Sequence, residues 1–207
     1  MDANAVLEAW DGRTGAYSPD YYAYFGSNET SAAVRDVLDG VVGRDAAVLE
    51  LGCGVGRHLA HLHAGGYRDL HGIDVNGDAV ELLAETYPAL AEDGTFHAAA
   101  IEDVLPTFAD GQFDAVYSVE TLQHVHHDNA WVFEEVARVT DDVLVTVELE
   151  GDAGEDPTGA PTVSYVDDAF PLYYRNWGRT FTDLGLEQVE SRSLGKDTLR
   201  VFHPAES

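Results

Sequence analysis

The chain has 207 residues, 45% of them hydrophobic, which is the size and composition of one globular domain and excludes a disordered acidic chain. It carries 38 acidic and 11 basic residues, a formal net charge of −27, and the acids are spread along the chain, so we expect them on the surface. With one cysteine, no long apolar run and no basic leader, we expect a cytoplasmic protein without internal disulfides or a membrane span.

The first 45 residues predict short helices. Met1 to Trp10 can form one helix, and the segment around Asn28 offers caps for another that runs to about Val42. Between them, Tyr17 to Phe25 is an aromatic cluster that either covers the edge of the core or contacts a ligand.

The stretch from Ala46 to His58 predicts a ligand site. Its apolar half, through Leu51, is typical of a strand buried on both faces. The glycines that follow lack the Cβ atoms that would block a tight turn, so amides at the start of the next helix can face an anion. We therefore expect a cofactor at this turn.

The next apolar run strengthens this expectation. Leu70 to Asp74 predicts a second parallel strand that delivers a carboxylate to ribose hydroxyls. Before it, Arg57 to His63 continues as a helix, and after it Asn76 caps a helix that ends before Pro88.

Strands and helices alternate from Val48 to Glu148. We expect strands at Thr95 to Ala99, Phe113 to Val119 and Asp142 to Leu149, a helix from about Asp128 to Val139 and a last helix from Tyr173 to Leu184. This alternation favours a parallel sheet with helices on both faces. Gly151 to Gly159 reads as an acidic surface loop, and Leu186 to Ser191 pairs with Thr198 to His203 as an antiparallel hairpin.

The pattern resembles class I S-adenosylmethionine-dependent methyltransferases over roughly Tyr22 to Phe202. Glu50 followed by Gly-x-Gly-x-Gly resembles motif I of that family, whereas the third glycine of the dinucleotide fingerprint would fall at Arg57. Phe113 to Val119 resembles motif IV, and Leu122 to Val125 resembles the turn after that strand.

The resemblance implies an α/β, Rossmann-like doubly wound sheet, mostly parallel and seven-stranded, with a C-terminal antiparallel hairpin. It implies one domain, residues 1–207. We divide it into an N-terminal helical cap (1–45), a cofactor-binding core (46–150) and an acceptor-side segment with the hairpin (151–207). The segment before the first strand often folds over the cofactor in this family.

The cofactor implied is S-adenosylmethionine. Ala100 stands where many members of the family carry the acid that faces adenine, so Glu102 is the candidate for that role. The residues expected at the cofactor are Glu50, Gly52, Cys53, Gly54, Gly56, Asp74, Val75, Ile101, Glu102 and Ser118.

Methyl transfer needs few catalytic side chains, and a base only when the acceptor is protonated. His124 is the candidate base, with an ordinary pKa near 6.5, although it could equally cap or pack its turn. His126 and His127 could be a polar helix start, and we expect no metal because these histidines lack an acidic or cysteine partner at a persuasive spacing.

Ser118 to Thr121 replaces the Asn-Pro-Pro-Tyr motif of adenine or glutamine methylation, which favours a small-molecule acceptor, through O or N, over nucleic acid. The aromatic residues from Phe170 to Trp177 either shape the acceptor site or pack on the sheet. A non-catalytic cofactor-binding or scaffold protein remains an alternative. A nicotinamide-dependent oxidoreductase is disfavoured by the glycine spacing and the hairpin.

The acidic composition resembles that of proteins from salt-loving archaea. Lys196 is the only lysine. At about 1 M salt the Debye length falls to roughly 3 Å, so repulsion among the carboxylates would be largely screened. The composition therefore predicts a fold that salt stabilises.

Overall fold

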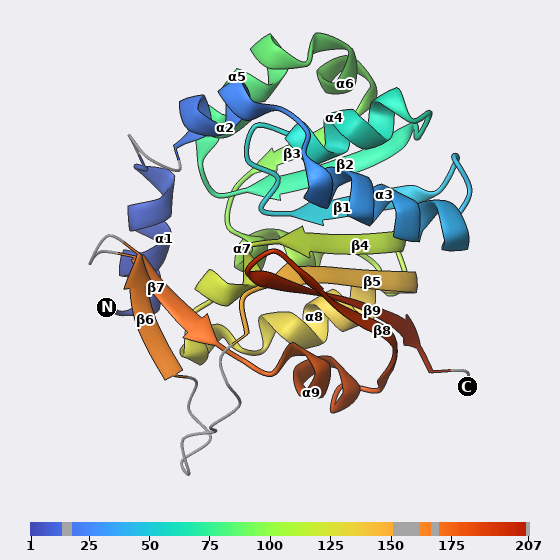
Figure 1. Cartoon of the computed structure of the whole chain (residues 1–207). Coiled ribbons are helices and arrows are strands. Elements are labelled where there is room, and N and C mark those ends of the chain that lie inside the picture. Colours follow the sequence, from blue (N-terminus) through green and yellow to red (C-terminus); the bar gives the residue numbers. More distant parts are fainter. Residues whose placement is uncertain (14–17, 151–161, 167–169, 206–207) are drawn as a thin grey trace.

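The computed structural model describes residues 1–13, 18–150, 162–166 and 170–205 (Figure 1). Tyr17 and the expected loop from Gly151 to Gly159 lie outside these ranges. The figure shows one sheet with helices on both sides, and a separate two-stranded sheet beside the N-terminal helix.

The main sheet has seven strands in the order β3-β2-β1-β4-β5-β9-β8. β9 alone runs against its neighbours, since it pairs antiparallel with both β5 and β8, while the other pairs are parallel. The strands are β1 Ala47–Leu51, β2 Asp69–Asp74, β3 Thr95–Ala98, β4 Phe113–Val119, β5 Thr140–Glu148, β8 Leu186–Leu194 and β9 Asp197–Pro204. The expected Rossmann-like fold with a C-terminal hairpin is confirmed.

Two apolar clusters fill the space between the sheet and its helices. One joins α3 and α4 to one face, and the other joins α7, α8 and α9 to the opposite face. The helices are α1 Ala3–Asp11, α2 Pro19–Phe25, α3 Glu29–Val41, α4 Arg57–Ala64, α5 Gly77–Thr86, α6 Pro88–Asp93, α7 Ile101–Val104, α8 Val132–Val139 and α9 Trp177–Thr182, with 3-10 turns at Leu105–Thr107, Leu122–His124 and His127–Asn129.

Local sequence signals place several boundaries. Asn28 forms a capping box with Ser31 at the start of α3, and Asn76 accepts the Ala79 amide at the start of α5. Pro88 ends α5 as expected, but it also opens α6, because proline fits the first turn of a helix.

The prediction of a helix from Tyr173 to Leu184 is wrong at its start. Tyr173 and Tyr174 belong to β7 Phe170–Tyr174, which pairs antiparallel with β6 Thr162–Val166. The spacing of Tyr173, Trp177 and Phe181 is typical of one face of a helix. In the structure, the backbone N–H and C=O groups of β7 are instead hydrogen-bonded to β6. The helix begins only at Trp177, where the Asn176 side chain caps it.

The helix expected from about Asp128 is also shorter than predicted. A separate 3-10 turn covers His127–Asn129, and α8 begins at Val132. None of the helices in the described ranges has the length and apolar character needed to cross a membrane.

The acidic residues lie overwhelmingly outside the core. Among the carboxylate residues in the described ranges, only Glu50 and Glu148 have almost no exposed surface. With a formal net charge of −27, the remaining acids repel one another across the folded surface more strongly than across the expanded unfolded chain.

We therefore expect salt to stabilise the fold. Thermal unfolding followed by circular dichroism should show a melting temperature that rises by several degrees between about 0.05 and 2 M KCl, with most of the rise complete near 1 M. At about pH 4.5, where many carboxylates are protonated, the rise should be smaller. A melting temperature that does not change with salt would contradict this account.

Candidate functional site

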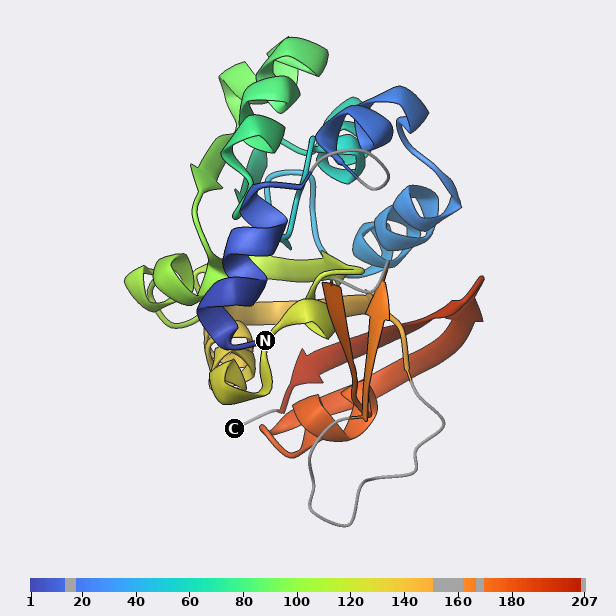
Figure 2. The ribbon, with the colours of Figure 1, turned by 90° about the vertical axis from the view of Figure 1, so that its left-hand side faces the viewer.

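A cavity lies at the carboxyl edge of the parallel strands, where ligands of open α/β sheets bind. Figure 2 shows that α1 lies across the carboxyl ends of the central strands of the main sheet. The cavity is lined from the glycine turn after β1, the end of β2, the start of α7, the loop after β4 and the inner side of α1.

The glycine turn is shaped by contact with the loop after β4. Gly52 has φ +70°, and a Cβ atom there would lie 2.0 Å from the Thr121 Oγ1. Gly54, at φ +51°, has open space where a Cβ would be. The Gly52 and Cys53 amides both donate to the Ile73 carbonyl, which ties the turn to β2. The turn is thus held rigidly and leaves room at Gly54 for a ligand to approach the backbone.

Asp74 lines the cavity and also holds the turn. Its Oδ2 accepts a hydrogen bond from the Gly54 amide at 2.7 Å, and its Oδ1 accepts one from the Asn76 amide at 2.9 Å. Burial raises the pKa of Asp74, and these two backbone hydrogen bonds act in the opposite direction. Each carboxylate oxygen keeps a lone pair with which it can accept from a ligand hydroxyl.

Glu102 also lines the cavity and offers it a buried acceptor atom. Its Oε1 accepts from the Asn129 side-chain amide at 3.0 Å, whereas its Oε2 is buried without a hydrogen-bond partner in the described part of the chain. Val75 and Ile101 also line the cavity here. A buried, unpaired carboxylate oxygen is costly, and a donor on a ligand would remove that cost.

Cys53 lines the cavity as a small buried side chain, and burial raises the pKa of its thiol well above the usual range. A protonated thiol is a poor nucleophile. Cys53 therefore shapes the wall of the cavity.

Three other predicted cofactor residues, Glu50, Gly56 and Ser118, lie behind the cavity wall. Glu50 accepts from the Tyr117 hydroxyl at 3.0 Å, and burial raises its pKa well above the usual range. Gly56 packs against α5, and Ser118 donates to Glu148 at 2.5 Å. Direct contact of these three with a cofactor stays a prediction.

His124 lines the cavity, and its tautomer follows from its hydrogen bond. Its Nδ1 lies 3.0 Å from the Pro171 carbonyl oxygen, which can only accept, so the neutral ring carries its proton on Nδ1 and a lone pair on Nε2. Trp10 covers the ring, with centroids 4.4 Å apart.

Burial lowers the pKa of His124 to about 4, so the expectation of an ordinary value near 6.5 is wrong. Water that would solvate the charged ring is excluded by side chains such as Trp10. His124 is consequently neutral at physiological pH.

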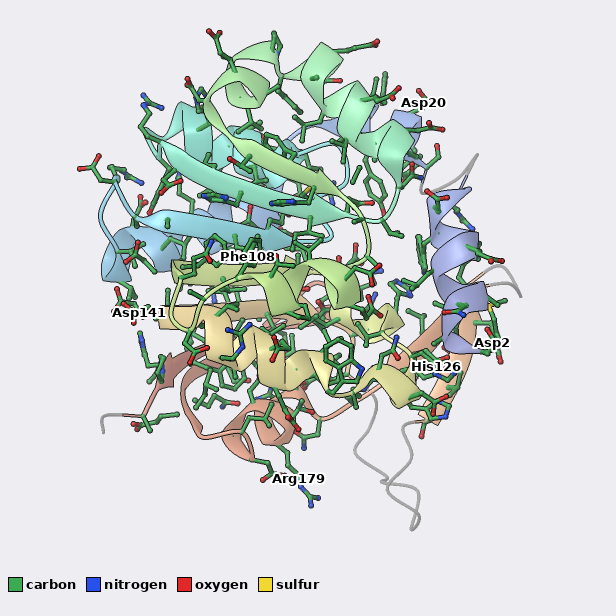
Figure 3. All side chains as sticks on the ribbon, turned by 180° about the vertical axis from the view of Figure 1, so that it is seen from behind. Asp2, Asp20, Phe108, His126, Asp141 and Arg179 are labelled. Carbon is green, nitrogen blue, oxygen red and sulfur yellow. The ribbon has the colours of Figure 1, made fainter. Side chains whose placement is uncertain are left out.

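His126 and His127 lie farther along the same loop, and His126 is beside the N-terminal end of α1 (Figure 3). Asp128 lies beside them, because ligand atoms of both histidines and of Asp128 lie within 4.8 Å of one another, and the expectation of no metal stays a prediction. Both nitrogens of His126 are already used, one by the Met1 carbonyl and the other by the Asp128 amide.

Sequence reasoning missed several residues that line the cavity. Trp10 and Arg13 come from α1 and the residues after it, Arg57 opens α4, and Lys196 reaches in from the β8–β9 turn to pair with Glu120. Glu120 has φ +51°, a positive value shared by no other non-glycine residue of the described ranges. The single lysine of an acidic chain was the one signal that could have marked this side of the cavity.

The chain is similar to known methyltransferases in sequence and in fold. Residues 48–142 match the family model described as a methyltransferase domain. An O-methyltransferase of Pyrenophora dematioidea is 28% identical over 92 residues, which cover 44% of this chain and 34% of that protein. The match thus spans about a third of the length of that relative.

Two solved structures show the same fold at low identity. The magnesium protoporphyrin IX methyltransferase of Synechocystis, solved with bound S-adenosylmethionine, is 15% identical with a TM-score of 0.69, covering 99% of this chain and 98% of that one. The 1,6-didemethyltoxoflavin-N1-methyltransferase of Burkholderia thailandensis, solved with S-adenosylhomocysteine, is 16% identical with a TM-score of 0.68, covering 86% and 78%. The chain therefore has the Rossmann-like class I methyltransferase fold, and residues 48–142 within it match the methyltransferase-domain family.

Proposed function

We propose that this protein is an S-adenosylmethionine-dependent methyltransferase that acts on a small-molecule acceptor. The observation that carries the proposal is a single cavity lined at once by the glycine turn, Asp74, Glu102 and His124. In this proposal the chain is one domain, with residues 1–45 as a helical cap, 46–150 as the cofactor-binding core and 151–207 as the acceptor-side segment.

The cavity offers groups that match S-adenosylmethionine. The open backbone at Gly54 would admit the amino-acid end, and Asp74 would accept from the ribose hydroxyls. The unpaired Glu102 oxygen would accept from the amino group of adenine. The bound cofactor supplies a methyl group on a sulfonium whose leaving group is already activated, so the protein acts mainly by holding the acceptor in line.

The acceptor side supports a small molecule. Trp10 and Leu172 contribute apolar surface to the cavity wall, while the ion pair of Glu120 and Lys196 contributes charged groups to its lining. The related and similar proteins named above include an O-methyltransferase and an N1-methyltransferase, which leaves both kinds of acceptor atom in the proposal.

His124 fits the role of proton acceptor for a hydroxyl. With its proton on Nδ1, the ring can accept a hydrogen bond at Nε2 and orient the acceptor oxygen. A pKa of about 4 makes it a weak base, but a hydroxyl oxygen that has gained a third bond becomes strongly acidic. Nε2 can therefore take the proton that leaves the acceptor oxygen as the new carbon–oxygen bond forms.

The proposal is tested first by titration calorimetry in about 2 M KCl with S-adenosylmethionine, S-adenosylhomocysteine and NAD. We expect binding of the first two at micromolar concentration and no binding of NAD. A methyl-donor turnover screen over small hydroxyl and amine acceptors follows. Cofactor binding without turnover would favour the non-catalytic alternative, and binding of NAD alone would reject the proposal.

Asp74→Ala should weaken S-adenosylmethionine binding by about 1.5–3 kcal/mol, the range for a charge-assisted hydrogen bond. Asp78→Ala is the matched control, because Asp78 is an exposed acid in the first turn of α5 and does not line the cavity. Calorimetry measures both affinities, and melting curves show whether the lost Gly54 contact has loosened the fold. An unchanged affinity in Asp74→Ala would remove it from the cofactor site.

His124→Gln should lower turnover roughly 10²-fold while cofactor affinity stays the same, because glutamine keeps size and polarity but cannot take up a proton. His127→Gln, a change at an exposed histidine outside the cavity, is the control. Rate and melting temperature are measured on the same samples. Normal turnover with a lower melting temperature would show that His124 only packs its turn.

The lowered pKa of His124 predicts a specific titration. Since burial disfavours the charged ring, its NMR midpoint should lie near 4, and turnover should show no limb from His124 between about pH 5 and 8. Trp10→Ala admits water to the ring and should raise the midpoint toward about 6.5. A wild-type midpoint already near 6.5 would refute this prediction.

A further inference from the structure

Glu148, the last residue of β5, is a fully buried carboxylate with four hydrogen-bond donors. Its Oε1 accepts from the Ser118 hydroxyl at 2.5 Å and from the amides of Thr121 and Leu122 at 3.2 and 3.1 Å. Its Oε2 accepts from the Gln123 amide at 3.2 Å. Three consecutive amides of the loop after β4 thus converge on one carboxylate.

Arg175 holds the carbonyl side of the same loop. Its guanidinium donates to the Leu122 carbonyl at 3.4 Å and to the Val125 carbonyl at 2.7 Å. Burial lowers the pKa of Arg175 to about 10, while Tyr173 and, to a smaller extent, Glu148 act in the opposite direction. The backbone amides of the loop therefore donate to a buried carboxylate, and its carbonyl groups accept from a partly buried guanidinium.

The loop held in this way carries the acceptor-side groups of the cavity. Thr121 fills the space that a Cβ of Gly52 would occupy, Glu120 stands at positive φ, and His124 closes the 3-10 turn. Neither Glu148 nor Arg175 lines the cavity. Both act through the backbone between them.

Packing alone does not explain a charge at this place. Burial raises the pKa of Glu148 to about 7, even though its four hydrogen bonds lower it, so the site disfavours the ionised form that these donors require. An apolar residue would avoid that desolvation cost, but it would leave three backbone amides without an acceptor.

We propose that Glu148 and Arg175 form a clamp that positions the loop of residues 120–125, and with it the Nε2 atom of His124, toward the acceptor. The clamp consists of positioning residues, since it touches neither acceptor nor cofactor. The inference rests on the proposed function for its catalytic consequence, whereas its effect on the loop can be measured without any turnover.

The test compares Glu148→Gln with Thr146→Val by amide hydrogen exchange and NMR. Glutamine keeps the shape but turns an N–H group toward amides that need an acceptor. Thr146 is the matched control, because it is equally buried in β5 and its hydroxyl has no partner within the described residues. Arg175→Lys is the second variant, since one ammonium cannot fork between the two carbonyls.

In Glu148→Gln and Arg175→Lys, we expect amide exchange at residues 121–123 to be at least about tenfold faster, while β1 and β2 stay protected. The His124 midpoint should move from near 4 toward about 6.5 as the ring gains access to water. Thr146→Val should change neither. If methyl transfer is observed, kcat should fall at least about tenfold with cofactor affinity changed by less than about threefold.

Unchanged exchange and an unchanged His124 midpoint in both variants would overturn the clamp. The same holds if exchange rises equally through the whole sheet, which would mean general destabilisation. Failure of the wild-type protein to bind S-adenosylmethionine would reject the proposed function instead. The hydrogen-exchange measurement would still test the clamp, because it does not depend on cofactor binding. If Glu148→Gln does not fold, the clamp is tested with Arg175→Lys alone, by amide exchange at residues 121–123 and by the His124 midpoint.

Discussion

The close approach of Gly52 to Thr121 is the constraint on which the site depends. β1 and β4 are neighbours in the sheet, with Leu51 opposite Ser118, so the turn after one strand must pass the loop after the other. A Cβ atom on Gly52 would lie 2.0 Å from the Thr121 side chain, a distance that no packing tolerates. The absence of one carbon atom thus lets the cofactor side and the acceptor side of the cavity share a wall.

The two fully buried carboxylates of the described ranges are hydrogen-bonded, and one of them, Glu148, holds backbone amides. The chain has 38 acidic residues, and the two carboxylates that are buried within the described ranges both have hydrogen-bond donors around them. Glu50 lies behind the glycine turn, and Glu148 lies behind the loop after β4. Since desolvating a carboxylate is costly, such groups persist where several donors converge. Both flank the segments that line the cavity.

The chemical state of His124 is set by segments far from it in sequence. Trp10 from α1 covers one side of the ring, and the Pro171 carbonyl from β7 fixes the proton on Nδ1. Phe170 lies against Trp10 and completes this apolar wall. The environment that lowers the pKa of His124 to about 4 is therefore assembled from both ends of the chain around the edge of the sheet.

From the sequence alone we could predict the main sheet and the two segments, the glycine turn after β1 and the end of β2, that line the cavity. Its signals there are local: apolar runs of strand length, glycines at fixed spacing and an acid at the end of β2, all within one strand-turn-helix unit and its neighbour. Only the tertiary structure shows that Tyr173 and Tyr174 join a strand, that His124 is neutral and that Glu148 accepts from three backbone amides. These outcomes depend on hydrogen-bond pairing and burial between segments distant in the chain, and neither quantity is encoded in the spacing of nearby residues.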